Sequence, residues 1–245
     1  DYRHWIHAIV EDQCRNYDLD GVMWCNERRS PVDQLISGSA PGDFSAASVR
    51  EAHERGLDVE GIKQVCREIY KVFQKLRAGE DTVDGALIEV LRVMLEHPEI
   101  LLWEKFWLER NKDLDRELYG MVKWINPNLQ FGLNVWNRNH FNPIRKAQWP
   151  WAEQVGYADW VKPITYQHQA GEIYQREMKA FHSSVLRDVS PELMNPLMYQ
   201  FLGLDEAPWE QLVQTGMKPE TYVYGQCEDA VRGVEGKIPV YMGLG

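Results

Sequence analysis

The sequence predicts an α/β protein of the (β/α)8 TIM-barrel type, of which this chain forms only a part. Four short apolar runs alternate along the 245 residues with segments of helical spacing: 21–26, 129–136, 159–166 and 238–244. No hairpin signal joins neighbouring runs, so we expect parallel strands connected through helices. Four strands are half of the eight in a closed barrel, and the chain begins at Asp1 without Met. We therefore expect that the remaining barrel strands belong to the same longer protein.

The first half of the chain opens with a helix and a buried strand. Apolar residues recur at helical spacing over 3–17. The run at 21–26 is too short for a helix and apolar on both faces, which is typical of a strand inside a parallel sheet. Residues 27–57 are rich in Gly, Ser, Pro and charge, and they predict a long loop. Helical periodicity returns over 58–78 and again over 84–96.

The second half continues the alternation of helices and strands. A long helix is predicted from Pro98 to about Trp124, because Pro is tolerated in a first helical turn. The strand at 129–136 follows an Asn-Pro-Asn turn signal. In the strand at 159–166, Pro163 indicates an irregular or locally unpaired position. Further helices are predicted at 171–187, 191–202 and 219–234.

We interpret residues 1–245 as a single barrel domain or a fragment of one. Within it, residues 28–125 form a long loop plus a helical insertion after the first strand. No GxGxxG or GxxxxGK[ST] motif follows any predicted strand, so the sequence does not indicate a dinucleotide- or nucleotide-binding fold.

Composition and charge exclude several classes of protein. The chain has 27 Lys and Arg against 37 Asp and Glu, a net charge of −10, and no basic run, so we expect no nucleic-acid partner. No apolar stretch is long enough to cross a membrane. The four cysteines lack metal-ligand spacing and are expected to be small core residues, so neither a metal nor another cofactor is predicted. Ten Trp and eleven Tyr suit stacking on sugar faces.

Polar and aromatic side chains follow the predicted strands at their carboxyl ends, where parallel α/β folds place their binding sites. Amides, guanidinium groups and imidazoles bind hydroxyl groups, while aromatic rings stack on the C–H face of a sugar. The sequence therefore predicts a carbohydrate substrate. The candidate substrate-binding residues are Trp24, Asn26, Arg28, Trp136, Asn137, His140, Tyr166 and His168.

Glu27 is the candidate catalytic residue. It closes the first predicted strand close to the apolar Trp24. A carboxyl group in apolar surroundings is desolvated, which raises its pKa and makes it a proton donor. Asn26 would then hold a substrate hydroxyl beside it. The alternative is that Glu27 only pairs with Arg28 or Arg29, or caps the long loop.

These residues also carry a resemblance to a known family. Retaining glycoside hydrolases of clan A have a fourth β-strand that is similar to Tyr17-Asp-Leu-Asp-Gly-Val-Met-Trp-Cys-Asn-Glu27. Poorly characterised bacterial glycosidase-like barrels have a helix start that resembles Gly56-Leu-Asp-Val-Glu60. The resemblance loosely covers most of the chain and implies that its strands are about strands 4 to 7 of a barrel.

The resemblance also implies an activity, a hydrolase of O-glycosyl bonds with Glu27 as general acid/base. It implies an extracellular or periplasmic location, which the residues themselves leave open. The clan places its nucleophile at the end of the seventh strand, but residues 241–245 contain no carboxylate. Glu172 and Asp33 are further carboxylates that a suitably folded loop would bring to the site.

Two other functions fit the same residues. A non-catalytic carbohydrate-binding barrel would keep the aromatic cleft without a pair of carboxylates. A metal-assisted barrel enzyme, such as a sugar isomerase, would use Glu27, His140 and His168 as ligands. Hydrolysis by the wild-type protein separates the first alternative from a glycosidase, and a bound stoichiometric metal ion supports the second.

Overall fold

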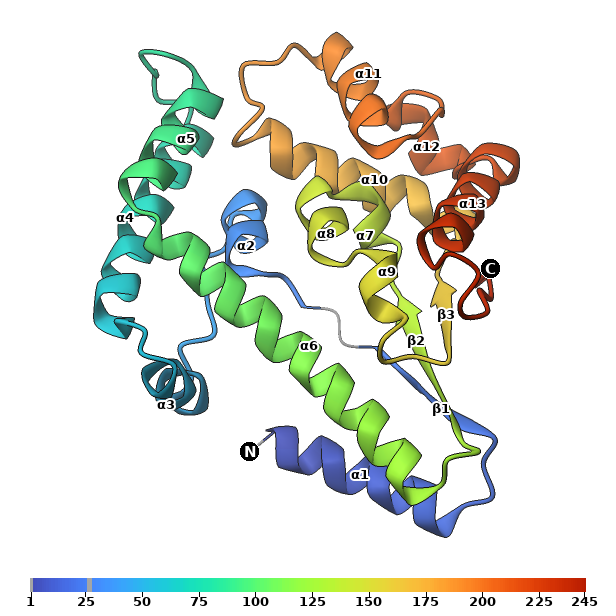
Figure 1. Cartoon of the computed structure of the whole chain (residues 1–245). Coiled ribbons are helices and arrows are strands. Elements are labelled where there is room, and N and C mark those ends of the chain that lie inside the picture. The colour runs from blue at the N-terminus through green and yellow to red at the C-terminus, as the bar shows by residue number, and fades with distance from the viewer. Residues whose placement is uncertain (1, 26–27) are drawn as a thin grey trace. The chain divides into compact units, whose positions relative to one another are not determined.

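The chain folds mainly into helices. The computed structural model describes residues 2–25 and 28–245 (Figure 1). Helices account for 63% of the residues, and the strands are three, short and parallel, in one open sheet of the described part. Over the same residues, no helix is both long and apolar enough to cross a membrane.

The chain divides into two compact units. The first unit contains residues 1–27, 111–175 and 197–245, and the second contains residues 28–110 and 176–196. The polypeptide therefore leaves the first unit after the first strand and returns to it within a long helix. The second unit starts at the residue where the helical insertion is predicted to start.

The sheet lies in the first unit. It consists of β1 (Gly21–Trp24), β2 (Gln130–Val135) and β3 (Trp160–Pro163), which are parallel and in that order. The predicted last strand runs beside β3, but it pairs only through isolated parallel bridges at Val240 and Gly243. The apolar runs thus predicted the three strands correctly. The fourth run was also predicted to be a strand, but in the structure it only lies along β3.

The prediction of a (β/α)8 TIM barrel is wrong. A barrel closes only when tilted, staggered strands are each paired on both sides. In the described part of the chain the sheet is open, β1 pairs with β2 alone, and the longest strand has six residues. Parallel strands joined through helices are common to barrels and open sheets, so the alternation in the sequence did not distinguish the two.

Helices pack against this sheet. The apolar cluster of the first unit joins one face of α1 (Ile6, Val10) to the C-terminal part of α6 (Leu118, Val122) and to Phe131 of β2. Figure 1 shows α1 beside the C-terminal end of α6. The helices with residues in this unit are α1 (Tyr2–Asn16), α6 (Glu99–Ile125), α7 (Arg138–Phe141), α8 (Pro143–Gln148), α9 (Trp151–Gln154), α10 (Gln167–His182), α11 (Pro191–Leu202), α12 (Trp209–Thr215), the π-helix η1 (Pro219–Val223) and α13 (Tyr224–Gly233).

The second unit is helical, and it corrects the prediction of a long loop at 27–57. Ser30 accepts a hydrogen bond from the backbone N–H of Asp33, and Ser45 accepts one from Ser48, so each serine caps a short helix. Helices of seven and nine residues are too short to show a clear apolar period, and the caps were their only signal. The helices that start in this unit are α2 (Pro31–Ser37), α3 (Ala46–Glu54), α4 (Val59–Arg77), α5 (Ala86–Glu96), α6 and α11.

Candidate functional site

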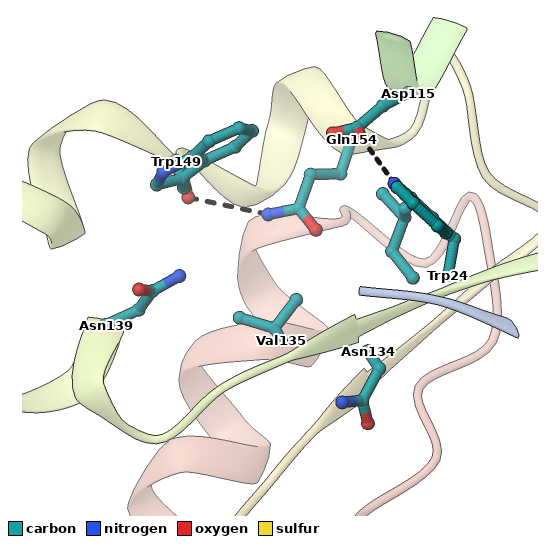
Figure 2. Close-up of a pocket in the computed structure, with 8 residues that line it drawn as sticks. Trp24, Asp115, Asn134, Val135, Asn139, Trp149 and Gln154 are labelled. Carbon is teal, nitrogen blue, oxygen red and sulfur yellow. Dashed lines mark hydrogen bonds between the residues drawn. The ribbon is translucent and has the colours of Figure 1, made fainter. Parts of the chain in front are cut away.

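A small pocket lies in the first unit at the carboxyl ends of β1 and β2 (Figure 2). Its volume is about 30 Å³. Two indoles, three amides and one carboxylate line it together with two aliphatic side chains. These residues are Trp24, Asp115, Leu133, Asn134, Val135, Asn139, Trp149 and Gln154.

Trp24 is held in the pocket by Asp115. The indole Nε1–H donates a hydrogen bond of 2.9 Å to Oδ1 of Asp115, whose side chain is only 3% exposed. Trp24 ends β1, whereas Asp115 comes from α6, so the bond joins two segments 91 residues apart. A carboxylate acceptor makes a stronger hydrogen bond than a neutral group, and the indole is therefore fixed in one orientation.

Gln154, at the end of α9, forms another wall of the pocket. Its side chain is 2% exposed, and Nε2 donates to the carbonyl oxygen of Trp149 over 3.5 Å. This long hydrogen bond favours the orientation in which Nε2 faces Trp149, since the reverse orientation would set two oxygens against each other. Oε1 of Gln154 has no hydrogen-bond partner among the described residues.

Two amide oxygens near the end of β2 also lack a hydrogen-bond partner among the described residues. Oδ1 of Asn134, which lines the pocket, and Oδ1 of Asn137 are buried and lack a partner in the described part of the chain. Buried polar atoms are normally hydrogen-bonded, and the exceptions often lie at sites that complete their bonds with a ligand or water. Asn137 does not line the pocket, and Figure 2 shows the amide of Asn134 directed away from Gln154. Oε1 of Gln154 is therefore the unpartnered acceptor of the described pocket that suits a group carrying O–H or N–H.

Of the residues predicted at the end of β1, Trp24 lines this pocket. Asn26 and Glu27 lie outside the described residues, so their roles stay predictions. Arg28 is exposed and belongs to the second unit. Its neighbour Arg29 donates to two carboxylates, Asp33 and Glu177.

The predicted residues after β2 are placed differently from one another. Trp136 is 38% exposed and Asn137 is buried, and neither lines the pocket. His140 is 3% exposed, and its Nδ1 lies 3.2 Å from the hydroxyl of Tyr222. Burial, with a smaller effect of the positive Lys146, lowers the pKa of His140 to about 3, so the imidazole is neutral.

The predicted residues after β3 form a pair of their own. The rings of Tyr166 and His168 are stacked with their centroids 6.4 Å apart, and His168 is exposed. Neither residue lines the pocket of Trp24. The structure thus places the predicted substrate residues of the three strands in separate surroundings.

The further carboxylates named as candidates do not lie in the pocket. Asp33 is fully buried in the second unit, where Arg29 donates to it over 3.3 Å. Glu172 is exposed on α10. The pocket carboxylate is Asp115, which the sequence did not point to.

No protein-family model and no curated protein matches this chain. Among residues 2–25 and 28–245, no three His, Cys, Asp or Glu side chains are grouped so that they could hold a metal ion. The metal-assisted alternative needs His140 and His168 as ligands of one ion. In the structure His140 contacts Tyr222 and His168 stacks on Tyr166, so each histidine has a different aromatic neighbour.

Sequence reasoning missed Asp115 and Gln154. Asp115 lies on α6 three residues before Leu118, on the side of the helix that faces the core. A charged residue flanking the apolar stripe is the signal that could have identified it. Gln154 lies in a four-residue helix, where no periodic signal develops.

Proposed function

We propose that the chain binds a carbohydrate at the carboxyl ends of β1 and β2 and hydrolyses an O-glycosidic bond. The observation that carries this proposal is the lining of one pocket by the indoles of Trp24 and Trp149 together with three amide side chains. Both indoles are partly exposed, so a sugar ring outside the small pocket stacks on their faces with its C–H side, while the amides donate to and accept from its hydroxyl groups.

Glu27 is the general acid/base of this proposal. It follows Trp24 by three residues in the sequence, and Asn26 beside it supplies an amide for a sugar hydroxyl. In the retaining mechanism an acid in this role protonates the leaving oxygen while a second carboxylate bonds to the sugar, and its carboxylate then takes a proton from the water that releases the sugar. The described pocket does not supply that second carboxylate, because Asp115 is buried and accepts the hydrogen bond of Trp24. The alternative, in which Glu27 only pairs with Arg28 or Arg29 or caps the following segment, predicts instead that replacing Glu27 leaves turnover unchanged.

A second candidate function is carbohydrate binding without hydrolysis. One observation favours it: the carboxylate of the described pocket, Asp115, is buried and accepts a hydrogen bond from Trp24. This makes Asp115 a positioning residue for the indole rather than a group that reaches a glycosidic oxygen.

The test is hydrolysis of a panel of aryl glycosides and glycans by the full-length protein and by Glu27→Gln. General acid/base catalysis contributes roughly 100- to 10,000-fold, so turnover in Glu27→Gln is expected to fall by at least about 100-fold while sugar affinity stays within a few-fold. The matched control is Glu220→Gln, which changes an exposed glutamate on η1 outside the pocket and is expected to keep wild-type turnover.

Three other results would each change the conclusion. Equal turnover in wild type and Glu27→Gln would contradict the role of Glu27. Saturable sugar binding without turnover in the wild type would leave the binding function and discard the hydrolase. Neither binding nor turnover would contradict the carbohydrate proposal as a whole.

A further inference from the structure

The pocket beside Trp24 is too small for a sugar ring. Its volume is about 30 Å³, whereas pockets that enclose whole small ligands measure roughly 300–1,000 Å³. A single water molecule needs roughly 10–15 Å³ of cavity space. The pocket therefore admits a group of hydroxyl size but no ring, and the rest of a sugar would have to lie outside it.

The polar atoms of the pocket are arranged to receive such a group. Figure 2 shows Oε1 of Gln154 directed away from Trp149, toward the side of the pocket that Val135 lines. The same view shows the amide of Asn139 directed into the space between it and Gln154. An acceptor that is 2% exposed and unpartnered in the described chain costs free energy until a donor reaches it.

The surroundings make this acceptor selective. Trp24 cannot turn its N–H toward the group, because Asp115 already accepts that N–H. Leu133 and Val135 offer no polar atom. Among the described residues that line the pocket, Gln154 has an acceptor atom, Oε1, that lacks a partner and belongs to a side chain more than nine-tenths buried. A hydroxyl group is the smallest organic group that can donate a hydrogen bond to it.

We propose that this pocket is a subsite for a single hydroxyl group of the carbohydrate and that Gln154 is its specificity residue. The hydroxyl donates its hydrogen to Oε1 of Gln154, while the sugar ring stays outside the pocket. The proposal rests on the carbohydrate binding proposed above and adds which residue distinguishes one sugar hydroxyl from another.

The test measures binding of methyl glycosides of glucose, galactose, mannose and xylose to the full-length protein by calorimetric titration. The best binder is then compared with its monodeoxy analogues. In the wild type, removal of one particular hydroxyl is expected to weaken binding by about 10- to 100-fold, because Oε1 of Gln154 is then buried without a donor. Removal of the other hydroxyls is expected to have smaller effects.

The variant Gln154→Met keeps the length of the side chain and removes the acceptor. It is expected to bind the parent glycoside and the critical deoxy analogue with affinities within about 2-fold of each other. The control Gln226→Met changes a glutamine on α13 that is also buried, 3% exposed, and does not line the pocket. It is expected to keep the wild-type difference.

The outcomes separate this inference from the proposed function. If Gln154→Met binds sugars but keeps the full wild-type loss for the deoxy analogue, the subsite is wrong and carbohydrate binding stands. If no methyl glycoside binds to the wild type, carbohydrate binding fails and the subsite fails with it. Should Gln154→Met not fold, a crystal structure of the wild type with the best glycoside decides: a sugar hydroxyl on Oε1 supports the subsite, and a retained water there overturns it.

Discussion

Protonation of His140 should make the folded protein less stable in mild acid. The imidazole is buried, and burial together with the positive charge of Lys146 lowers its pKa to about 3, with Asp229 opposing in part. In the unfolded chain the pKa of a histidine is about 6.5. Between these two values the unfolded state binds a proton that the folded state does not, so stability is fully present above pH 6.5 and falls as the pH drops.

The size of the effect follows from these two pKa values. Between pH 8 and pH 5 the linkage relation gives a loss of about 2 kcal/mol in the free energy of unfolding from His140 alone. Other groups titrate in the same range, so the contribution of His140 is obtained as a difference between variants. The variant is His140→Gln, which removes the titrating group and keeps polar atoms near Tyr222.

The assay is urea unfolding of wild type and His140→Gln at pH 8 and pH 5, followed by circular dichroism. From pH 8 to pH 5 the free energy of unfolding of the wild type is expected to fall by about 2 kcal/mol more than that of His140→Gln. The control His53→Gln removes an exposed histidine on α3, and its free energy of unfolding is expected to fall over this interval by as much as that of the wild type. Equal losses in wild type and His140→Gln would refute the reasoning, since the imidazole would then gain its proton equally in both states.

Two further predictions concern stability in the first unit, and urea unfolding measures both. Asp115→Leu removes the hydrogen-bond acceptor of Trp24 and is expected to lower the free energy of unfolding by about 1–3 kcal/mol. Asp115→Asn keeps an acceptor and should lower it less, so equal stability of the two variants would contradict the role of this bond. At Gly171 an added Cβ would lie 1.9 Å from the backbone oxygen of Leu212, so Gly171→Ala should cost at least about 1–3 kcal/mol. Gly120→Ala, with open space around it, should instead stabilise by up to about 1 kcal/mol, and a loss as large as that of Gly171→Ala would show that the close approach is not the cause.

Local apolar patterns were sufficient to predict most of the elements. The runs at 21–26, 129–136 and 159–166 each contain one strand of the sheet, and the helix predicted from Pro98 to Trp124 is α6 almost to the residue. These segments bury continuous apolar surface, which leaves a periodic signal in the sequence. Closure into a barrel is a property of strand number and pairing, and no local pattern encodes it.

The pocket could be predicted only in part for a related reason. Trp24 was found because it ends a strand, and strand ends are the expected place for a site. Asp115 reaches it from a helix 91 residues away, and the hydrogen bond between them depends on how α6 packs against β1. A single sequence contains the two residues but not their proximity, and the same applies to Gln154.

The larger segment of the second unit, residues 28–110, is inserted between the two hydrogen-bonded residues of the pocket. The chain leaves the first unit at residue 28, four residues after Trp24, and re-enters it at residue 111, four residues before Asp115. Because the entropy of closing a loop grows only with the logarithm of its length, lengthening a connection from roughly 10 to roughly 90 residues costs only about 2 kcal/mol. Since every lining residue belongs to the first unit, the proposed hydroxyl subsite takes its chemistry from that unit alone.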